Sequence, residues 1–403
     1  MTNLEVLERI FELIQVGQWP IANGEPYQSF GLGQQSLSII GGENLLECNQ
    51  LVNFLHSKDR EIYRSYSRKV FLEKLMAFIR PIKLKDVVPT QEQVREFFSS
   101  LRAEELKKFR VLREIFGIAL KSPGSPCLIG NFKIYHFPTL RNSFEQTIGP
   151  TLQLMTVPKE PNYLIEYEVE SREQNRAIEI ADDYFKMFVL FLRHTIGTSD
   201  ERFEVGILDY SAWKGRSAHV ICGEQYFSNA ERYGSYEPIP IDDPYFTNSE
   251  SGYDKLWENI DKVNLSKLGK RICTAIEWIG RSLIEKTVQT AFIEASVALE
   301  SIFTFSEKTI VTPSILSQIS ESVALLLGNT TEHRIAIEKQ IKQLYSIRSG
   351  IVHAGDKEVA ASDYNLFIQY IRLVIAKLLT EEAFIKCNTI EDVYSVLKHM
   401  KYS

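Results

Sequence analysis

Apolar residues recur at helical spacing through the first part of the chain. Over residues 3–17 they repeat at intervals of three and four, which predicts an amphipathic helix. Residues 44–80 and 91–120 are predicted to form further helices, and Thr90 is placed as a capping residue before the second of these stretches. Residues 24–42 are rich in Gly, Ser and Gln, which predicts a loop.

The pattern changes near Pro123, where β-branched and aromatic residues begin to alternate or cluster between Pro and Gly residues. Such runs are typical of strands. The predicted strands cover residues 127–137, 163–169, 202–209 and 217–222, and a predicted helix covers residues 172–195. Residues 223–253 contain many Tyr, Ser, Pro and Asp residues without a period, which indicates either a long surface loop or a linker between domains.

From residue 257 onward nearly the whole chain has the pattern of helices. A chain of 403 residues is too long for one small core, so we expect two domains. The sequence predicts an α+β domain over residues 1–250 and an all-α domain over residues 256–403. The expected fold class is therefore mainly α, with an N-terminal α+β domain followed by an all-α helical bundle.

The composition is that of an ordinary globular protein, with 44% hydrophobic and 24% charged residues. The formal net charge of −6 provides no overall positive field for nucleic acid, so any RNA has to be bound by a local patch. Residues 1–15 include acidic side chains where a secretory signal needs a basic start, and no apolar stretch reaches the length of a membrane span. We therefore expect a cytoplasmic protein without a membrane partner.

Five cysteines are spread along the sequence without a close pair, at Cys48, Cys127, Cys222, Cys273 and Cys387. This spacing provides neither a disulfide framework nor the ligand set of a zinc site, and it is typical of a reducing compartment. We expect no metal and no cofactor. Residues 1–250 also lack a Walker-type phosphate loop, a nucleophile elbow and a His-Glu-x-x-His motif, so their sequence indicates no activity.

The candidate chemistry lies in residues 342–356, where Arg348 is followed five positions later by His353. This spacing also arises by chance, so the surrounding pattern has to decide its meaning. Apolar residues at helical steps predict a buried stripe on this helix, made of Ile337, Ile341, Leu344, Ile347 and Ile351. The residues placed on the opposite, outward side are Tyr345, Arg348, Ser349 and His353.

Residues 268–380 resemble the HEPN superfamily and, within it, the Apea-like branch. The segments that carry the resemblance are 275–283 (AIEWIGRSL), 292–303 (FIEASVALESIF) and 344–355 (LYSIRSGIVHAG), with 319–328 (ISESVALLLG) between the second and third. The third is the most specific, because the family pattern is a Tyr, then Arg, a polar residue, three further residues and His, followed by a small residue. Ser349 departs from the Asn, Asp or His that HEPN nucleases often have after the arginine.

The resemblance implies a bundle of four or five helices that forms a homodimer, with two motifs brought together at the interface. It also implies metal-independent cleavage of RNA, with Arg348 and His353 as catalytic residues and Tyr345 and Ser349 as supporting residues. Imidazole suits this role because it titrates near neutral pH and can move protons to and from ribose and phosphate oxygens. A guanidinium is a permanent forked cation suited to a phosphate that gains charge. Glu300 is either a further supporting residue or a structural carboxylate.

Two other classes of function stay open. One is a non-catalytic HEPN module, a dimerising scaffold whose N-terminal domain recognises a ligand or a protein. The other is a nucleotide-binding or transferase-like enzyme with its site in the N-terminal domain. We expect an RNA-cleaving effector whose layout is similar to that of phage-defence and toxin proteins. In that layout the N-terminal domain senses a trigger or partner, which the sequence does not identify.

Overall fold

The structure is a computed structural model of the chain. The residues that it describes are 1–17, 25–31, 35–141, 163–199, 203, 205–207, 215–222, 225–232, 237–260, 265–304, 315–354 and 358–402. Contacts divide the chain into two compact units. The N-terminal unit comprises residues 1–111 and 168–182, and the C-terminal unit comprises residues 112–167 and 183–403.

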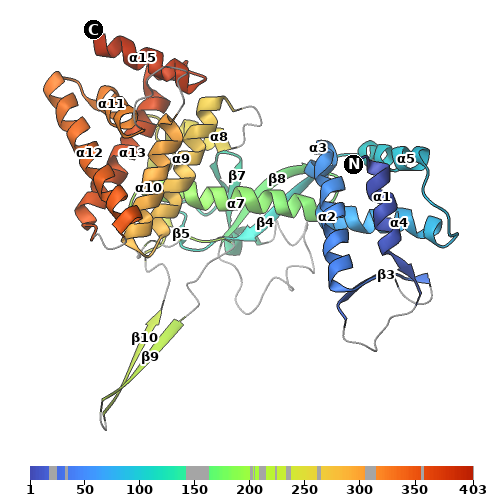
Figure 1. The fold of residues 1–403 in the computed structure, drawn as a ribbon. Helices are drawn as coiled ribbons and strands as arrows, with labels where there is room; N and C mark the ends of the chain where they lie inside the picture. The colour runs from blue at the N-terminus through green and yellow to red at the C-terminus, as the bar shows by residue number, and fades with distance from the viewer. Residues whose placement is uncertain are drawn as a thin grey trace. The chain divides into compact units, whose positions relative to one another are not determined.

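The N-terminal unit packs helices and a small sheet around one hydrophobic core (Figure 1). Its helices are α1 (Asn3–Leu13), α2 (Gly42–Lys58), α3 (Arg60–Ser65), α4 (Arg68–Lys83) and α5 (Gln91–Ala103). Its antiparallel sheet has the order β1 (Gln15–Val16), β3 (Leu37–Ile40) and β2 (Tyr27–Phe30). Strands β2 and β3 lie within residues 24–42, which the sequence predicted as a loop. The prediction missed them because strands of four residues are too short to show a clear period.

Helix α5 begins where the sequence predicted it. The Thr90 hydroxyl accepts a hydrogen bond from the Gln93 backbone N–H, and the Gln93 side chain accepts one from Thr90, which completes a capping box. The predicted extension of this helix to residue 120 is wrong, since α5 ends at Ala103 and β4 (Lys107–Glu114) follows. Strand β4 pairs with β8, and this long-range pairing outweighs the local helical pattern.

The strands of the middle region agree in part with the prediction. A four-stranded sheet has the order β4, β8 (Tyr163–Ser171), β7 (Phe132–His136) and β6 (Cys127–Ile129). The other strand pairs are β9 (Gly215–Cys222) with β10 (Gln225–Arg232), and β5 (Ile118–Ala119) with β11 (Ile239–Pro240). Residues 223–253, expected as a loop or linker, thus contain β10, β11 and the 3-10 helix η3 (Pro244–Thr247). Residues 202–209 are described only in part.

Beyond η3, all regular elements of the described chain are helices, and α9 and α10 lie side by side (Figure 1). These helices are α8 (Tyr253–Ile260), α9 (Lys267–Ile284), α10 (Val288–Phe303), α11 (Ile315–Leu327), α12 (Thr331–Ala354), α13 (Ala361–Thr380), α14 (Glu382–Ile385) and α15 (Ile390–Tyr402). The predicted fold class is therefore confirmed as an N-terminal α+β part followed by an all-α region.

The compact units differ in extent from the domains expected from the sequence. Helix α7 (Gln174–Ile196) contributes residues 183–196 to the C-terminal unit, where the rings of Phe188 and Trp257 lie 5.2 Å apart. A Cβ added at Gly280 of α9 would lie 2.5 Å from the Leu190 carbonyl oxygen of α7. The end of α7 therefore packs directly on the C-terminal helices, and the division between compact units does not fall near residue 250.

None of the helices in the described part of the chain combines the length and the apolar character that crossing a bilayer requires.

Candidate functional site

The candidate motif lies on α12, which packs against α10, α11 and α13. The predicted apolar stripe is confirmed for its first three members, because Ile337, Ile341 and Leu344 are buried. Ile347 and Ile351, nearer the end of the helix, are only half-buried. Near the motif, the buried face of α12 therefore does not follow the predicted stripe.

Tyr345 belongs to this buried face, with 6% of its surface exposed. Its hydroxyl donates a hydrogen bond to the Ser296 carbonyl oxygen on α10 at 3.4 Å, and its ring lies edge-on to Phe367 on α13, with 5.9 Å between ring centres. Burial raises the pKa of Tyr345 well above its ordinary value. The prediction that Tyr345 faces outward is wrong, because contacts with three helices bury a face wider than the predicted stripe.

Arg348 lies at the edge of this buried face. Its Nη2 atom is 3.5 Å from Oε1 of Glu300 on α10, and the two side chains are 32% and 23% exposed. This distance exceeds that of a charge-assisted hydrogen bond, and a guanidinium has five N–H donors. The Nε atom of Arg348 is buried and has no hydrogen-bond partner among the described residues. Arg348 is thus held loosely and keeps most of its hydrogen-bonding capacity.

Glu300 is the candidate supporting residue that the structure brings next to Arg348. Burial raises the pKa of Glu300, and the nearby Arg348 guanidinium offsets part of this effect. The desolvation of the carboxylate therefore outweighs its attraction to a cation 3.5 Å away. Burial therefore destabilises the charged form of Glu300, and a closer approach of Arg348 would reduce this destabilisation.

Ser349 and His353 are exposed on α12. Five residues correspond to a rotation of about 140° around an α-helix, so Arg348 and His353 do not share a face of α12. The structure therefore brings Tyr345, Arg348 and Glu300 together and leaves His353 apart from them. Residues 355–357, which follow the motif, lie outside the described residues.

Two residues around Tyr345 were not predicted from the sequence. Ser296 precedes Glu300 by four positions on α10, which places both on one face of that helix. This spacing was a usable signal once Glu300 had been singled out. Phe367 carries no such signal, because its position depends on how α13 packs against α12.

Other chemistry is limited in the described residues. They contain no group of three or more His, Cys, Asp or Glu side chains that could hold a metal ion. The free cysteines among them are Cys48, Cys127, Cys273 and Cys387. Burial raises the pKa of the Cys273 thiol to about 12 and that of Cys48 to about 11, so neither thiol is a ready nucleophile near neutral pH. The side chain of Cys222 lies outside the described residues.

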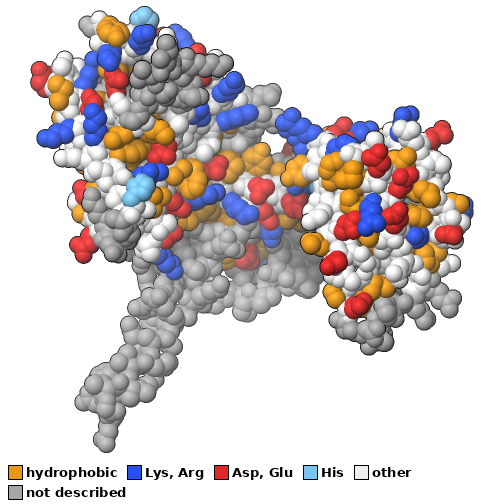
Figure 2. Space-filling view, in the orientation of Figure 1, with side chains coloured by type: hydrophobic (Ala, Val, Ile, Leu, Met, Phe, Trp, Pro, Cys, Tyr) orange, Lys and Arg blue, Asp and Glu red, His pale blue; other side chains and the backbone are white. Residues whose placement is uncertain are grey.

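The surface charges are mixed on the face of the molecule that Figure 2 shows. Lys and Arg side chains are interspersed there with acidic and hydrophobic ones and do not gather into one broad field. This distribution agrees with the net charge of −6. An anionic polymer would therefore be bound on this face by a few local cations.

Comparison of the chain with models of protein families, with curated proteins and with solved structures finds no match. The likeness to HEPN proteins therefore rests on the motif and the flanking segments of this sequence alone.

Proposed function

We propose that the C-terminal helical region is a metal-independent endoribonuclease of HEPN type. The observation that carries the proposal is the state of the motif on α12. Among the described residues, Arg348 is held by a 3.5 Å contact with Glu300, and His353 is exposed on the same helix. A loosely held guanidinium is available to bind a phosphate, and an exposed imidazole is available to transfer a proton.

In the proposed reaction, His353 takes the proton of a ribose 2′-hydroxyl. The 2′-oxygen forms a bond to phosphorus, the bond between phosphorus and the 5′-oxygen breaks, and the leaving oxygen takes a proton from a general acid. Arg348 stabilises the negative charge that the phosphate gains in the transition state. The products are a 2′,3′-cyclic phosphate and a 5′-hydroxyl, and the ribose itself is the nucleophile.

The placement of the two residues on α12 favours a site shared by two copies of the chain. Arg348 and His353 are separated by about 140° around the helix, and one copy supplies a single His353. The reaction has one proton to remove and one to return, so two imidazoles fit it better than one. A two-fold homodimer would bring two motifs to one interface. Light scattering should then show a dimer at tens of micromolar, and a monomer at that concentration would contradict the shared site.

We also propose a setting for this activity. The layout fits a phage-defence or toxin-like effector in the cytoplasm, in which the N-terminal unit responds to a trigger and the C-terminal helices cut RNA. Because an untriggered protein can be silent, the decisive experiment compares variants in cells.

The test is therefore made with the full chain, both in cells and after purification. Wild-type protein should cleave RNA in the presence of EDTA and leave 2′,3′-cyclic phosphate ends, and an RNA with a 2′-deoxy group at the cut should resist. His353→Ala and Arg348→Ala should each remove most of the cleavage, and their effects should not add, since both act on one transition state. His333→Ala removes another exposed histidine of α12 and is the matched control.

A non-catalytic dimerising scaffold is the second candidate. The observation that favours it is the Glu300 carboxylate beside Arg348, since a neighbouring anion partly neutralises the cation that would bind phosphate. Both candidates predict a dimer, and only the nuclease predicts a role for His353. If cells that express the wild-type protein with its trigger keep their RNA as intact as cells with the His353→Ala variant, the scaffold replaces the nuclease.

A further inference from the structure

Helix α7 belongs to both compact units. Its residues 174–182 are part of the N-terminal unit, and its residues 183–196 are part of the C-terminal unit. Each half is held by contacts within its own unit. Because helix formation is cooperative along the chain, a change in one half of a continuous helix affects the stability of the other half.

One carboxylate caps the first turn of α7. Glu173 accepts hydrogen bonds from the backbone N–H groups of Asn175 and Arg176, at 2.6 and 2.8 Å. The same carboxylate accepts a hydrogen bond from the backbone N–H of Ser67 at 2.7 Å. Ser67 is the N-cap residue of α4. Glu173 therefore joins the starts of α7 and α4, where the helix dipoles favour a negative charge.

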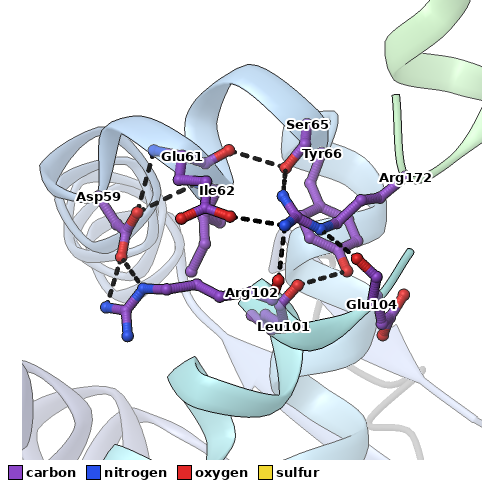
Figure 3. A network of polar contacts seen from close by, with 9 residues as sticks. All are labelled: Asp59, Glu61, Ile62, Ser65, Tyr66, Leu101, Arg102, Glu104 and Arg172. Atoms are coloured by element: carbon purple, nitrogen blue, oxygen red, sulfur yellow. Dashed lines mark hydrogen bonds and ion pairs between the residues drawn. The ribbon is translucent and has the colours of Figure 1, made fainter. Parts of the chain in front are cut away.

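Arg172 strengthens this attachment (Figure 3). Its side chain is 4% exposed and makes four hydrogen bonds of 2.6 to 2.8 Å, two to side chains of α3 and two to backbone carbonyl groups. The side-chain acceptors are Ser65 and Glu61. The start of α7 is thus tied to α3 and α4, so a rearrangement of these helices has to alter the hold on α7.

The second half of α7 is held by the helices of the C-terminal unit. Gly280 lets α9 approach the α7 backbone, because an added Cβ there would lie 2.5 Å from the Leu190 carbonyl oxygen. The Thr195 carbonyl oxygen, at the end of α7, accepts hydrogen bonds from the Tyr245 hydroxyl at 2.9 Å and from Arg372 of α13 at 3.0 Å. A guanidinium at this end also complements the helix dipole.

The contacts continue from α7 toward the candidate site. Helix α9 is linked to α10, the helix that carries Glu300, by a hydrogen bond of 2.7 Å from the Ser282 hydroxyl to the Ala291 carbonyl oxygen. Helix α13, which carries Arg372, also carries Phe367, whose ring packs against Tyr345. Two contact routes therefore lead from α7 to the surroundings of Arg348.

We propose that α7 transmits the conformational state of the N-terminal unit to the C-terminal helices. A change that loosens the Glu173 cap destabilises α7 along its length, and with it the contacts that α9 and α13 make with its second half. This inference goes beyond the proposed ribonuclease and does not depend on it, since the coupling is a property of local stability.

Hydrogen exchange of the full-length protein, followed by mass spectrometry, tests the proposal. Loss of an N-cap raises the equilibrium constant for opening of a helix by about fivefold. Glu173→Ala should therefore speed exchange several-fold in residues 174–182 and also in residues 186–197 and 270–284. Thr90→Ala is the matched control, because it removes the cap of α5 in the same unit without touching α7. If Glu173→Ala affects only the N-terminal unit, as Thr90→Ala should, the proposal is overturned.

The reverse direction gives a second test that does not require a folded Glu173→Ala variant. Coupling is reciprocal, so a disturbance in the C-terminal unit has to reach the first half of α7. Gly280→Ala crowds the Leu190 backbone and should speed exchange in residues 174–182 several-fold. At Gly269, on the same helix, an added Cβ would lie nearest to the Leu265 and Ser266 side chains, so Gly269→Ala should leave exchange in residues 174–182 unchanged. Equal, unaltered exchange there in both variants would exclude transmission through α7.

Discussion

Two arginines show how differently the two units hold a cation. Arg172 of the N-terminal unit is 4% exposed, and its side chain makes four hydrogen bonds no longer than 2.8 Å. Arg348 of the C-terminal unit is 32% exposed, and among the described residues it pairs with Glu300 at 3.5 Å. A buried charge is tolerated only when its donors are satisfied. Arg172 is therefore a structural cation, whereas several N–H donors of Arg348 have no partner among the described residues.

The largest expected effect follows from this difference. Arg172→Ala leaves two partly buried carbonyl groups and the buried Ser65 hydroxyl without their donor, so the free energy of unfolding of the N-terminal unit should fall by about 1–3 kcal/mol. Arg348→Ala should cost the C-terminal unit less than about 1 kcal/mol, as is usual for a partly exposed ion pair. Native-state hydrogen exchange measures the two units separately.

Arg102→Ala is a control from the same network. Arg102 pairs with Asp59, but its side chain is 44% exposed, so we expect a loss below about 1 kcal/mol. Equal losses for Arg172→Ala and Arg348→Ala would remove the distinction between the two arginines. The candidate site would then lose its main structural support.

The sequence predicted the parts of the fold that depend on local pattern. The helix expected over residues 172–195 is observed as Gln174–Ile196, and the cap at Thr90 is confirmed. Strand β4 was predicted as helix because its pairing with β8 is a long-range contact that a local pattern does not contain. The attachment of residues 183–196 to the C-terminal helices was missed for the same reason.

The sequence predicted which residues belong to the candidate site better than it predicted their arrangement. The motif spacing placed Arg348 and His353 on one helix, and both are on α12. The periodicity of α12 predicted that Tyr345 is exposed, because this residue lies outside the apolar stripe. Its burial depends on Phe367 and Ser296, which belong to helices far away in the sequence. A helical wheel gives relative angles, and only packing determines how wide the buried face is.

Buried histidines extend the comparison between the units to pH. Burial, with repulsion from Arg372, lowers the pKa of His194 in the C-terminal unit to about 3. Burial also lowers the pKa of His56 in the N-terminal unit, although a hydrogen bond with the Tyr66 carbonyl oxygen acts in the opposite direction. The unfolded chain takes up these protons near pH 6.5, so stability conferred by the neutral histidines is lost as the pH falls below about 6.5.

We expect the larger loss in the C-terminal unit, where for His194 it continues down to about pH 3. Thermal unfolding at pH 7.5 and pH 5 measures the effect. His194→Gln, which cannot take up a proton, should show a smaller drop in melting temperature between these two pH values than the wild type does. His333→Gln replaces an exposed histidine of the same unit and should keep the wild-type drop. An unchanged drop in His194→Gln would mean that other groups cause the acid sensitivity.

The smallest expected effects come from two tyrosine hydroxyls. Tyr66 of the N-terminal unit donates to the Leu101 carbonyl oxygen at 3.1 Å, and Tyr345 donates to the Ser296 carbonyl oxygen at 3.4 Å. A hydrogen bond of this kind contributes about 1 kcal/mol, and less as it lengthens. Tyr66→Phe should therefore lower the free energy of unfolding by about 1 kcal/mol, and Tyr345→Phe by about 0.5 kcal/mol.

Tyr345→Phe also tests whether this residue supports the packing of α12 or takes part in the proposed reaction. With 6% of its surface exposed, Tyr345 has its hydroxyl turned to the α10 backbone and away from solvent. A bound phosphate would be held by Arg348, while the Tyr345 ring supports α12 through Phe367, a contact that phenylalanine retains. RNA cleavage, if His353 is shown to be required for it, should thus survive Tyr345→Phe almost unchanged. A large loss of cleavage with the expected small loss of stability would mean that α12 turns Tyr345 outward when the site is formed, as the sequence pattern first indicated.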